Sequence, residues 1–188
     1  MSIKINYSNK AISKSSANLV LFTDEKFTIN NLKKYISSAE FSYINDLLKI
    51  NDLKKNMFVF EVNSKKKVVL ISIKKDLKNF EIENLGAEFY GRVNYGKNSE
   101  YFINTDSIIG KYENFTSYFL HGMKLKSYEF NKYKTKKEVR LISINVSGNK
   151  NKPSAQNQLK FKALEEGIFY ARDLVSEPGN VLHPDEYA

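Results

Sequence analysis

The sequence predicts an α/β fold: a three-layer sandwich in which helices cover both faces of a mixed, mostly parallel sheet of about five strands. Two observations carry this prediction. Short apolar runs typical of buried strands alternate along the chain with longer segments whose apolar residues recur at helical spacing. In addition, the 188 residues are 41% hydrophobic and 27% charged, which is the balance of a globular chain long enough to bury a core.

Five strands and three helices follow from this alternation. The strands are expected at residues 17–22, 57–62, 68–73, 101–104 and 139–146. The residues Asn63-Ser64-Lys65 between the second and third strands predict a hairpin turn. The helices are expected at residues 32–48, 76–95 and 112–122. Gly86 and Gly91 weaken the second helix, and Gly122 is expected to end the third.

The clearest helix lies near the carboxyl end, at residues 157–175, after a polar loop at 147–154. At 1.5 Å per residue it is about 28 Å long, which is enough to cross a small domain. Its apolar residues share one face and are therefore expected to pack on the domain. They are Phe161, Leu164, Ile168, Ala171 and Val175.

The order of these segments divides the chain into three parts. They are an amino-terminal α/β domain at 1–150, a linker helix at 151–178 and the start of a truncated domain at 179–188. The third part is inferred from Pro184-Asp185-Glu186, which has the form of a helix start, with proline followed by acids. A helix needs on the order of 12 residues to be marginally stable alone. We therefore expect the sequence to be cut within a larger architecture.

Composition excludes several classes of protein. The chain has no cysteine, which removes disulfides and thiolate chemistry. Its apolar runs are far shorter than the ~20 residues of a membrane-spanning helix, and the first residues lack the apolar stretch of a secretory signal. The expectation is a cytoplasmic protein with no membrane partner.

A net charge of +9 raises the possibility of a nucleic-acid partner. Only three of the 30 basic residues are arginines, however, and a lysine-rich surface is also explained by a general drift in composition. The best candidate contact is a basic segment with interleaved aromatic residues. It holds Lys124, Lys126, Lys132, Lys134, Lys136 and Lys137, together with Tyr128, Phe130 and Tyr133. Such a segment could bind phosphates and stack on bases, or it could be a charged edge strand whose rings pack on the core.

No catalytic or metal-binding residue is predicted. His121 and His183 are the only histidines and lie far apart in the sequence. We interpret His121 as a packed or capping residue and His183 as a helix N-cap. No Gly-rich phosphate-binding motif and no G-x-S-x-G motif is present.

Two segments resemble the leucyl aminopeptidases (cytosol aminopeptidases, peptidase family M17). The segment from Ala171 to Pro184 resembles the connection between the two domains of that family. The segment from Phe119 to Lys137 resembles a block near the end of the family's amino-terminal domain. The order and the spacing of the two blocks also fit. Departures are Ser176 where asparagine is common, Gly179 where proline is frequent and His183 where threonine is usual.

The resemblance implies a two-domain hydrolase that removes amino-terminal residues from peptides. Members hold two divalent metals, manganese or zinc, in a catalytic domain that follows the linker, and their ligands come partly from an N-T-D-A-E-G-R-L motif. Asn104-Thr105-Asp106 copies three of these letters but precedes the linker, so we interpret the match as accidental. Residues 1–188 are therefore expected to form a macro-domain-like cap with no cofactor and no activity of its own. The resemblance also implies a homo-hexamer and, from some bacterial members, DNA as a partner.

Two other functions stay open at this level. The chain could be a free-standing module that binds nucleic acid or a nucleotide-like ligand. It could also be a purely structural assembly domain.

Overall fold

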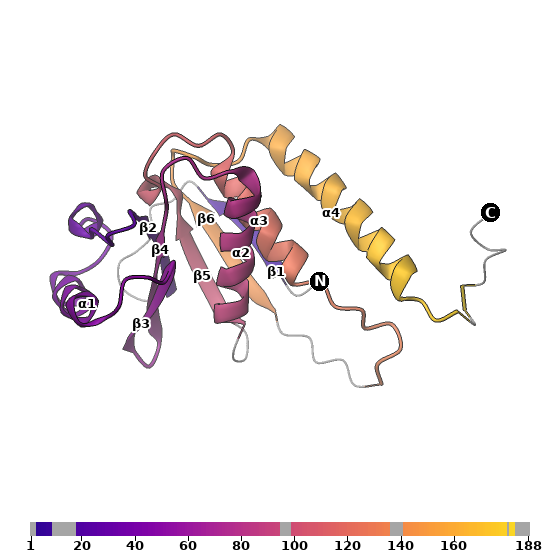
Figure 1. Ribbon diagram of the computed structural model, residues 1–188, viewed down its shortest axis with the longest axis horizontal. Helices are drawn as coiled ribbons and strands as arrows, with labels where there is room; N and C mark the ends of the chain where they lie inside the picture. Colours follow the sequence, from indigo (N-terminus) through magenta and orange to yellow (C-terminus); the bar gives the residue numbers. More distant parts are fainter. Residues whose placement is uncertain (1–2, 9–17, 95–98, 136–140, 180, 183–188) are drawn as a thin grey trace.

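The computed structural model describes residues 3–8, 18–94, 99–135, 141–179 and 181–182 (Figure 1). Within these ranges the chain forms an α/β sandwich built on a six-stranded sheet. The strands are β1 (Ile3–Ser8), β2 (Asn18–Thr23), β3 (Met57–Asn63), β4 (Lys66–Ser72), β5 (Ser99–Asn104) and β6 (Ile142–Ser147). The four α-helices are α1 (Ser38–Ile50), α2 (Asn79–Val93), α3 (Phe115–Lys126) and α4 (Ala155–Ser176).

The sheet has the order β1-β6-β5-β2-β4-β3. Every neighbouring pair is parallel except β3–β4, the predicted hairpin. The sequence predicted about five strands, and the additional one is β1 at the edge, paired with β6. The alternation of Ile3, Ile5 and Tyr7 with polar residues is the signal that could have found it.

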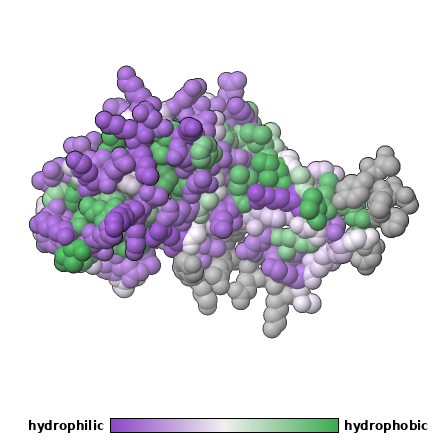
Figure 2. Space-filling view, viewed as in Figure 1, coloured by the Kyte–Doolittle hydropathy of each residue, from purple (hydrophilic) through white to green (hydrophobic). Residues whose placement is uncertain are grey.

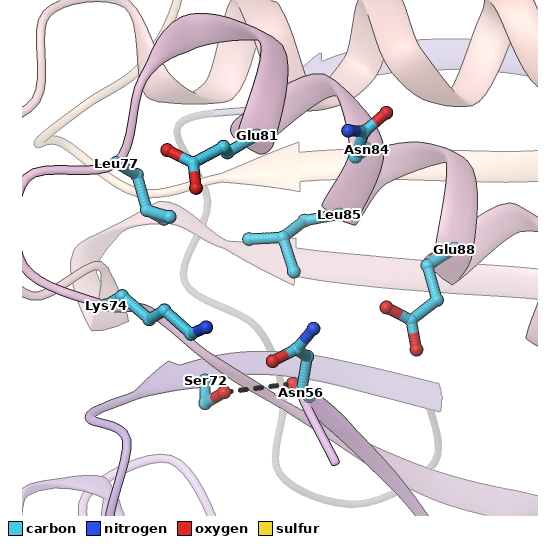
Figure 3. A pocket seen from close by; sticks show the side chains of 8 residues that line it. All are labelled: Asn56, Ser72, Lys74, Leu77, Glu81, Asn84, Leu85 and Glu88. Carbon is cyan, nitrogen blue, oxygen red and sulfur yellow. Dashed lines mark hydrogen bonds between the residues drawn. The ribbon is translucent and has the colours of Figure 1, made fainter. Parts of the chain in front are cut away.

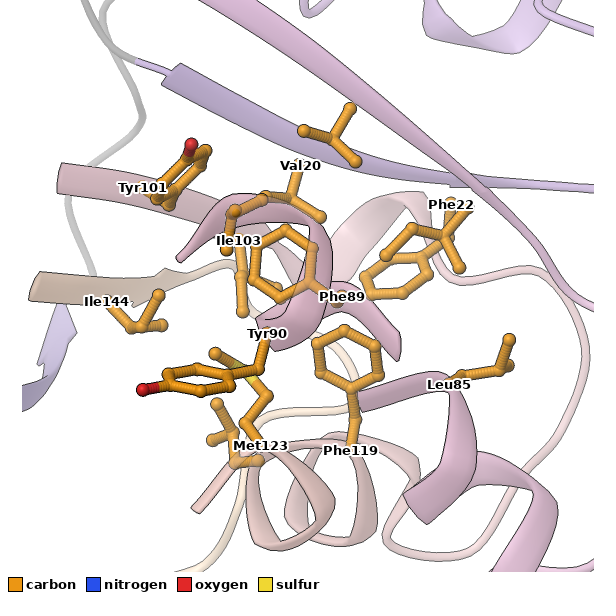
Figure 4. Packing of buried hydrophobic residues seen from close by; sticks show 14 of the residues in the cluster. Val20, Phe22, Leu85, Phe89, Tyr90, Tyr101, Ile103, Phe119, Met123 and Ile144 are labelled. Carbon is orange, nitrogen blue, oxygen red and sulfur yellow. The ribbon is translucent and has the colours of Figure 1, made fainter. Parts of the chain in front are cut away.

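Two apolar clusters separate the layers. Leu19 and Leu21 of β2 face α1, whereas Val20 and Phe22 of the same strand face α2 and α3. This alternation follows from the period of a strand, in which successive side chains point to opposite faces. On the second face, Phe22 and Phe89 both pack against Phe119 of α3 (Figure 4). The centre of the Phe119 ring lies 5.5 Å from that of Phe22 and 5.7 Å from that of Phe89.

Glycines set the distance between α2 and α3. A Cβ atom on Gly86 would lie 1.9 Å from the carbonyl oxygen of Phe119, and one on Gly122 would lie 1.9 Å from that of Glu83. The two backbones therefore touch at positions where any side chain would clash. Gly122, which was expected to end its helix, lies inside α3, which continues to Lys126. The expectation was wrong because this glycine serves helix packing rather than a helix end.

The carboxyl-terminal helix α4 matches its predicted range closely and begins at the N-cap Ser154, whose side chain accepts from Asn157 N. It packs on α3, on the side away from the sheet (Figure 1). The predicted packing face is wrong in part. Phe161 is buried, but Leu164 and Val175 are exposed, and the second buried residue of the helix is Glu165. The contact is polar because α3 offers a histidine and a lysine at this position.

Candidate functional site

The predicted basic segment does not form the edge strand considered above; its described part is the end of α3 followed by irregular structure. Lys124 and Lys126 lie in the last turn of α3, and residues 127–135 form an irregular segment with no strand. Lys132 and Lys134 lie in this segment, whereas Lys136 and Lys137 are outside the described residues. The segment forms no sheet edge because its side chains pack along α4 instead.

Two of these lysines are held by carboxylates of α4 and its C-cap. Lys124 Nζ lies 2.5 Å from Glu165 Oε2, and Lys132 Nζ lies 2.6 Å from Glu177 Oε1. The hydroxyl of Tyr133 also donates to Glu177. The hydrogen bonds that Lys132 and Tyr133 donate to Glu177 lower the pKa of the Glu177 carboxyl. The Lys132–Glu177 hydrogen bond also raises the pKa of Lys132. Lys126 and Lys134 are exposed.

The aromatic residues of the segment are also engaged by α4. Tyr128 stacks on Phe169 with ring centroids 5.5 Å apart, and the Arg172 guanidinium lies 5.4 Å from the centre of the Tyr128 ring. The Tyr128 hydroxyl donates to Asp173 Oδ1 at 2.8 Å, and Arg172 donates to the carbonyl of Leu125 at 2.8 Å. The Tyr128 ring is thus engaged within the chain, whereas the Tyr133 ring is 52% exposed.

Glu165 is the buried centre of this contact. Its Oε1 lies 3.3 Å from His121 Nδ1, while its Oε2 receives the Lys124 ammonium. His121 is buried and packs against the ring of Phe161, 5.2 Å away, which confirms its interpretation as a packed residue. Sequence reasoning missed Glu165, although its place one turn after Phe161 puts both on one helix face. We call the contact of α4 and its C-cap with α3 and residues 127–133 the polar seam. It comprises His121, Lys124, Tyr128, Lys132, Tyr133, Glu165, Phe169, Arg172, Asp173 and Glu177.

The carboxyl ends of the parallel strands are the usual ligand-binding edge of such a sheet. Here a short 3₁₀ turn at Thr105–Ser107 covers that edge, and its side chains form hydrogen bonds with the backbone of the neighbouring strands. Ser107 Oγ accepts from Phe22 N at 3.0 Å, and Thr105 Oγ1 donates to the carbonyl of Ser147 at 3.1 Å. Asp106 Oδ1 accepts from the backbone of the loop after β6, at Asn149 and Lys150. The Asn104-Thr105-Asp106 triplet thus ties the end of β5 to β6 and to the loop after β6, while the adjacent Ser107 makes the bond to β2.

The described surface includes two hollows that the following residues line. The smaller, about 200 Å³, lies between the end of β4 and α2 and mixes apolar, amide and charged groups (Figure 3). It is lined by Asn56, Ser72, Lys74, Leu77, Glu81, Asn84, Leu85 and Glu88. The larger, about 490 Å³, is an open groove between residues 130–132 and the last turns of α4. It adjoins the polar seam and includes Tyr170 and Leu174.

The described residues hold no group of three or more histidine, cysteine, aspartate or glutamate side chains that could bind a metal ion. Nor does any helix among them have the length and apolar composition to cross a membrane. The donor set of a two-metal site is therefore not assembled in the described part of the chain.

Curated relatives match the chain over part or nearly all of its length. The cytosol aminopeptidase of Rickettsia prowazekii (strain Madrid E) is 25% identical over 209 aligned positions, which cover 99% of this chain and 40% of that protein. A probable cytosol aminopeptidase of Methylorubrum extorquens is 39% identical over 75 residues, 37% of this chain and 15% of that protein. No family model matches the chain.

Two solved structures share the fold. A mutant of tomato leucine aminopeptidase aligns with a TM-score of 0.70 and 15% identity, over 99% of this chain and 40% of that one. The cytosol aminopeptidase from Coxiella burnetii aligns with a TM-score of 0.60 and 14% identity, over 96% of this chain and 35% of that one. The chain thus spans 40% or less of the length of each of these proteins. In sequence along its length and in fold, it resembles the amino-terminal domain of the leucyl, or cytosol, aminopeptidases.

Proposed function

We propose that this chain is the amino-terminal domain of a dimetal aminopeptidase that removes amino-terminal residues from peptides. The observation that carries the proposal is the match along 99% of the chain to both a curated cytosol aminopeptidase and a solved leucine aminopeptidase. Each of those proteins extends well beyond the matched region. In this proposal the domain caps the enzyme and helps to assemble it, as a homo-hexamer in the cytoplasm, and α4 leads to the catalytic domain.

Two divalent metals, manganese or zinc, would supply a polarised substrate carbonyl and an activated water in the enzyme as a whole. The described residues of this chain do not offer a donor set for them. The role we assign to the chain is therefore positional. The polar seam holds α4 against α3 and so fixes the direction in which the chain leaves the sheet domain.

The proposal is tested by assaying the chain and its natural gene product side by side. Residues 1–188 should release no amino acid from a leucyl chromogenic substrate with Mn²⁺ or Zn²⁺ present. A protein isolated from the source cells with antibodies to residues 1–188 should be longer and should hydrolyse that substrate until a chelator removes its metal. Metal-dependent hydrolysis by residues 1–188 alone would contradict the assigned division of roles, and an inactive natural product would contradict the enzyme assignment.

A second candidate function is nucleic-acid binding through the predicted lysines. It is supported by the net charge of +9 and by the exposure of Lys126 and Lys134. Lys124 and Lys132 contribute less in this candidate because α4 carboxylates already neutralise them. Binding would therefore be of the non-specific, salt-sensitive kind that rests on phosphate contacts.

A further inference from the structure

The smaller hollow, between the end of β4 and α2, has charges of opposite sign on its two sides. We call it the α2 pocket, and its lining residues are Asn56, Ser72, Lys74, Leu77, Glu81, Asn84, Leu85 and Glu88. Figure 3 shows the Lys74 ammonium on one side and the Glu88 carboxylate on the other, with the side chains of Leu85 and Asn56 between them. The surrounding face of the molecule is largely hydrophilic, with smaller hydrophobic areas (Figure 2).

Several polar groups of the α2 pocket have hydrogen-bonding capacity to spare. Within the described chain, the Lys74 ammonium and the side-chain amides of Asn56 and Asn84 form no hydrogen bond or ion pair. Glu88 accepts from Arg92 on Oε1 alone, at 2.7 and 3.0 Å, so its Oε2 has no donor in the same part of the structure. The pocket can therefore offer donors and an acceptor to a small molecule without breaking an existing contact.

The backbone around the α2 pocket is held by contacts that do not use these groups. Ser72 donates from its backbone N and from its Oγ to the carbonyl of Asn56, at 2.8 and 3.2 Å. The carbonyl of Lys74 accepts from the Tyr112 hydroxyl. Because these segments are fixed before a ligand arrives, binding requires little reorganisation of the backbone.

The charges at the α2 pocket are balanced. Glu81 accepts from Lys78 N at 2.8 Å and so caps the start of α2, while Glu88 forms a partly exposed ion pair with Arg92. Lys74 and Arg92 therefore stand against two carboxylates, and the pocket with this partner has no net charge. A ligand with a net charge would leave one side uncompensated, whereas a ligand with one charge of each sign complements both sides.

Volume and the apolar wall limit the ligand further. At about 200 Å³ the α2 pocket is smaller than the ~300–1,000 Å³ of sites for drug-sized ligands, which favours a small molecule over a nucleotide. Leu85 is buried and Leu77 is half-buried, and both line the pocket. A short apolar group of the ligand would be removed from water against them.

We propose that the α2 pocket binds a free α-amino acid with an apolar side chain. Its carboxylate pairs with Lys74 Nζ, its ammonium pairs with Glu88 Oε2, and its side chain packs against Leu85. This site stands on the pocket alone and does not rest on the proposed enzymatic function. Amino-acid binding is measured without peptide substrate or metal. A negative result here would therefore leave the enzyme assignment standing, and an inactive natural product would leave this site standing.

The first test follows the amide NMR signals of the ¹⁵N-labelled chain at pH 7 while L-leucine is added to about 10 mM, a range that detects a millimolar Kd. The signals of Ser72, Asn84 and Leu85 should shift, with a Kd below about 1 mM. Two analogues, 4-methylpentanoate without the amine and L-leucinamide without the carboxylate, should each bind at least tenfold more weakly. No shifts with L-leucine, shifts only at residues away from the pocket, or an analogue that binds as well as L-leucine would overturn the proposal.

The second test assigns the two charged ends by substitution. Lys74→Met should weaken L-leucine binding at least tenfold, whereas the matched control Lys75→Met, at an exposed neighbour outside the pocket lining, should leave it unchanged. Glu88→Gln should also weaken binding at least tenfold, and its control is Glu83→Gln, on the same helix but outside the lining. Thermal melting of all four variants close to that of the wild type shows that the fold is intact. If either pocket variant binds L-leucine as well as its control does, the assigned pairing is wrong.

Discussion

At the scale of single residues, Glu165 decides how α4 is attached. A carboxylate that is 3% exposed needs partners, and it receives the Lys124 ammonium on one oxygen and the His121 ring on the other. Its sequence neighbour Glu166 is exposed and has only an i,i+4 lysine at 3.8 Å. The two adjacent glutamates therefore allow a matched comparison.

We expect Glu165→Gln to lower the free energy of unfolding by about 1–3 kcal/mol, because the amide keeps the shape but loses the charge that the buried partners bind. Glu166→Gln should change it by less than about 0.5 kcal/mol. Urea unfolding followed by circular dichroism measures both values. Similar values for the two variants would mean that Glu165 does not hold α4 in place.

Tyr7 of β1 provides a prediction about alkaline pH. Burial, and secondarily the negative charge of Glu165, raise its pKa to about 12 from the ordinary 10.0. Because the folded state holds this proton more tightly than the unfolded chain does, the stability it contributes is complete below about pH 10 and is lost as the pH rises through about 12. Unfolding free energies measured at several pH values from about 9 to 11.5 should therefore fall more steeply for the wild type than for Tyr7→Phe. Parallel curves would show that Tyr7 is not perturbed.

At the scale of elements, the contact between α2 and α3 depends on two glycines that the sequence presented only as weak points. Gly86 and Gly122 lie where the backbones touch, while Gly91 of the same α2 helix faces open space. A helix pattern in one sequence does not distinguish these cases, because the difference lies in what the neighbouring helix places against each position.

Alanine substitutions separate the two situations. Gly86→Ala and Gly122→Ala should each destabilise the fold by about 2 kcal/mol or more, because the methyl group forces the helices apart. Gly91→Ala should stabilise it by about 0.5–1 kcal/mol through helix propensity alone. Thermal and urea unfolding of the three variants measure this difference. A stabilising Gly122→Ala would mean that the helices are not in backbone contact.

Element types were more predictable than element contacts. The β3–β4 hairpin and the range of α4 follow from local pattern, because strand and helix periods are written in neighbouring residues. The face of α4 that packs was predicted less well, since an apolar face is expected to be inward only when the partner is apolar too. Here α3 presents His121 and Lys124, so the helix turns Glu165 inward and leaves Leu164 and Val175 outside.

At the scale of the whole molecule, the net charge is +9, and some of the lysines behind it already form ion pairs with carboxylates of the same chain. The predicted lysines that the structure describes divide into a paired group, Lys124 and Lys132, and an exposed group, Lys126 and Lys134. Of these four, only the exposed group has cations available for phosphate without breaking the polar seam.

If the chain binds DNA, its affinity should fall steeply between ~50 and ~200 mM salt. The double variant Lys126→Gln with Lys134→Gln should reduce the slope of log affinity against log salt by about 2, one for each phosphate that is no longer neutralised. Lys49→Gln with Lys54→Gln, in α1 and the turn after it, removes the same charge from lysines that already pair with Asp46 and Asp52 and should leave the slope nearly unchanged. Fluorescence anisotropy with a labelled duplex measures the slopes. Binding that is absent at low salt, or equally affected by both pairs, would exclude these lysines as the binding surface.

The sequence by itself determined the α/β class, most of the strands and helices, and the resemblance to leucyl aminopeptidases, because all of these are recorded in local periods and motifs. Tertiary structure alone decided that the Asn104-Thr105-Asp106 triplet closes the sheet edge, that Glu165 is buried, and that α4 turns apolar residues outward. These features depend on which residues distant in sequence meet, and no local pattern specifies the chemistry of the opposing surface.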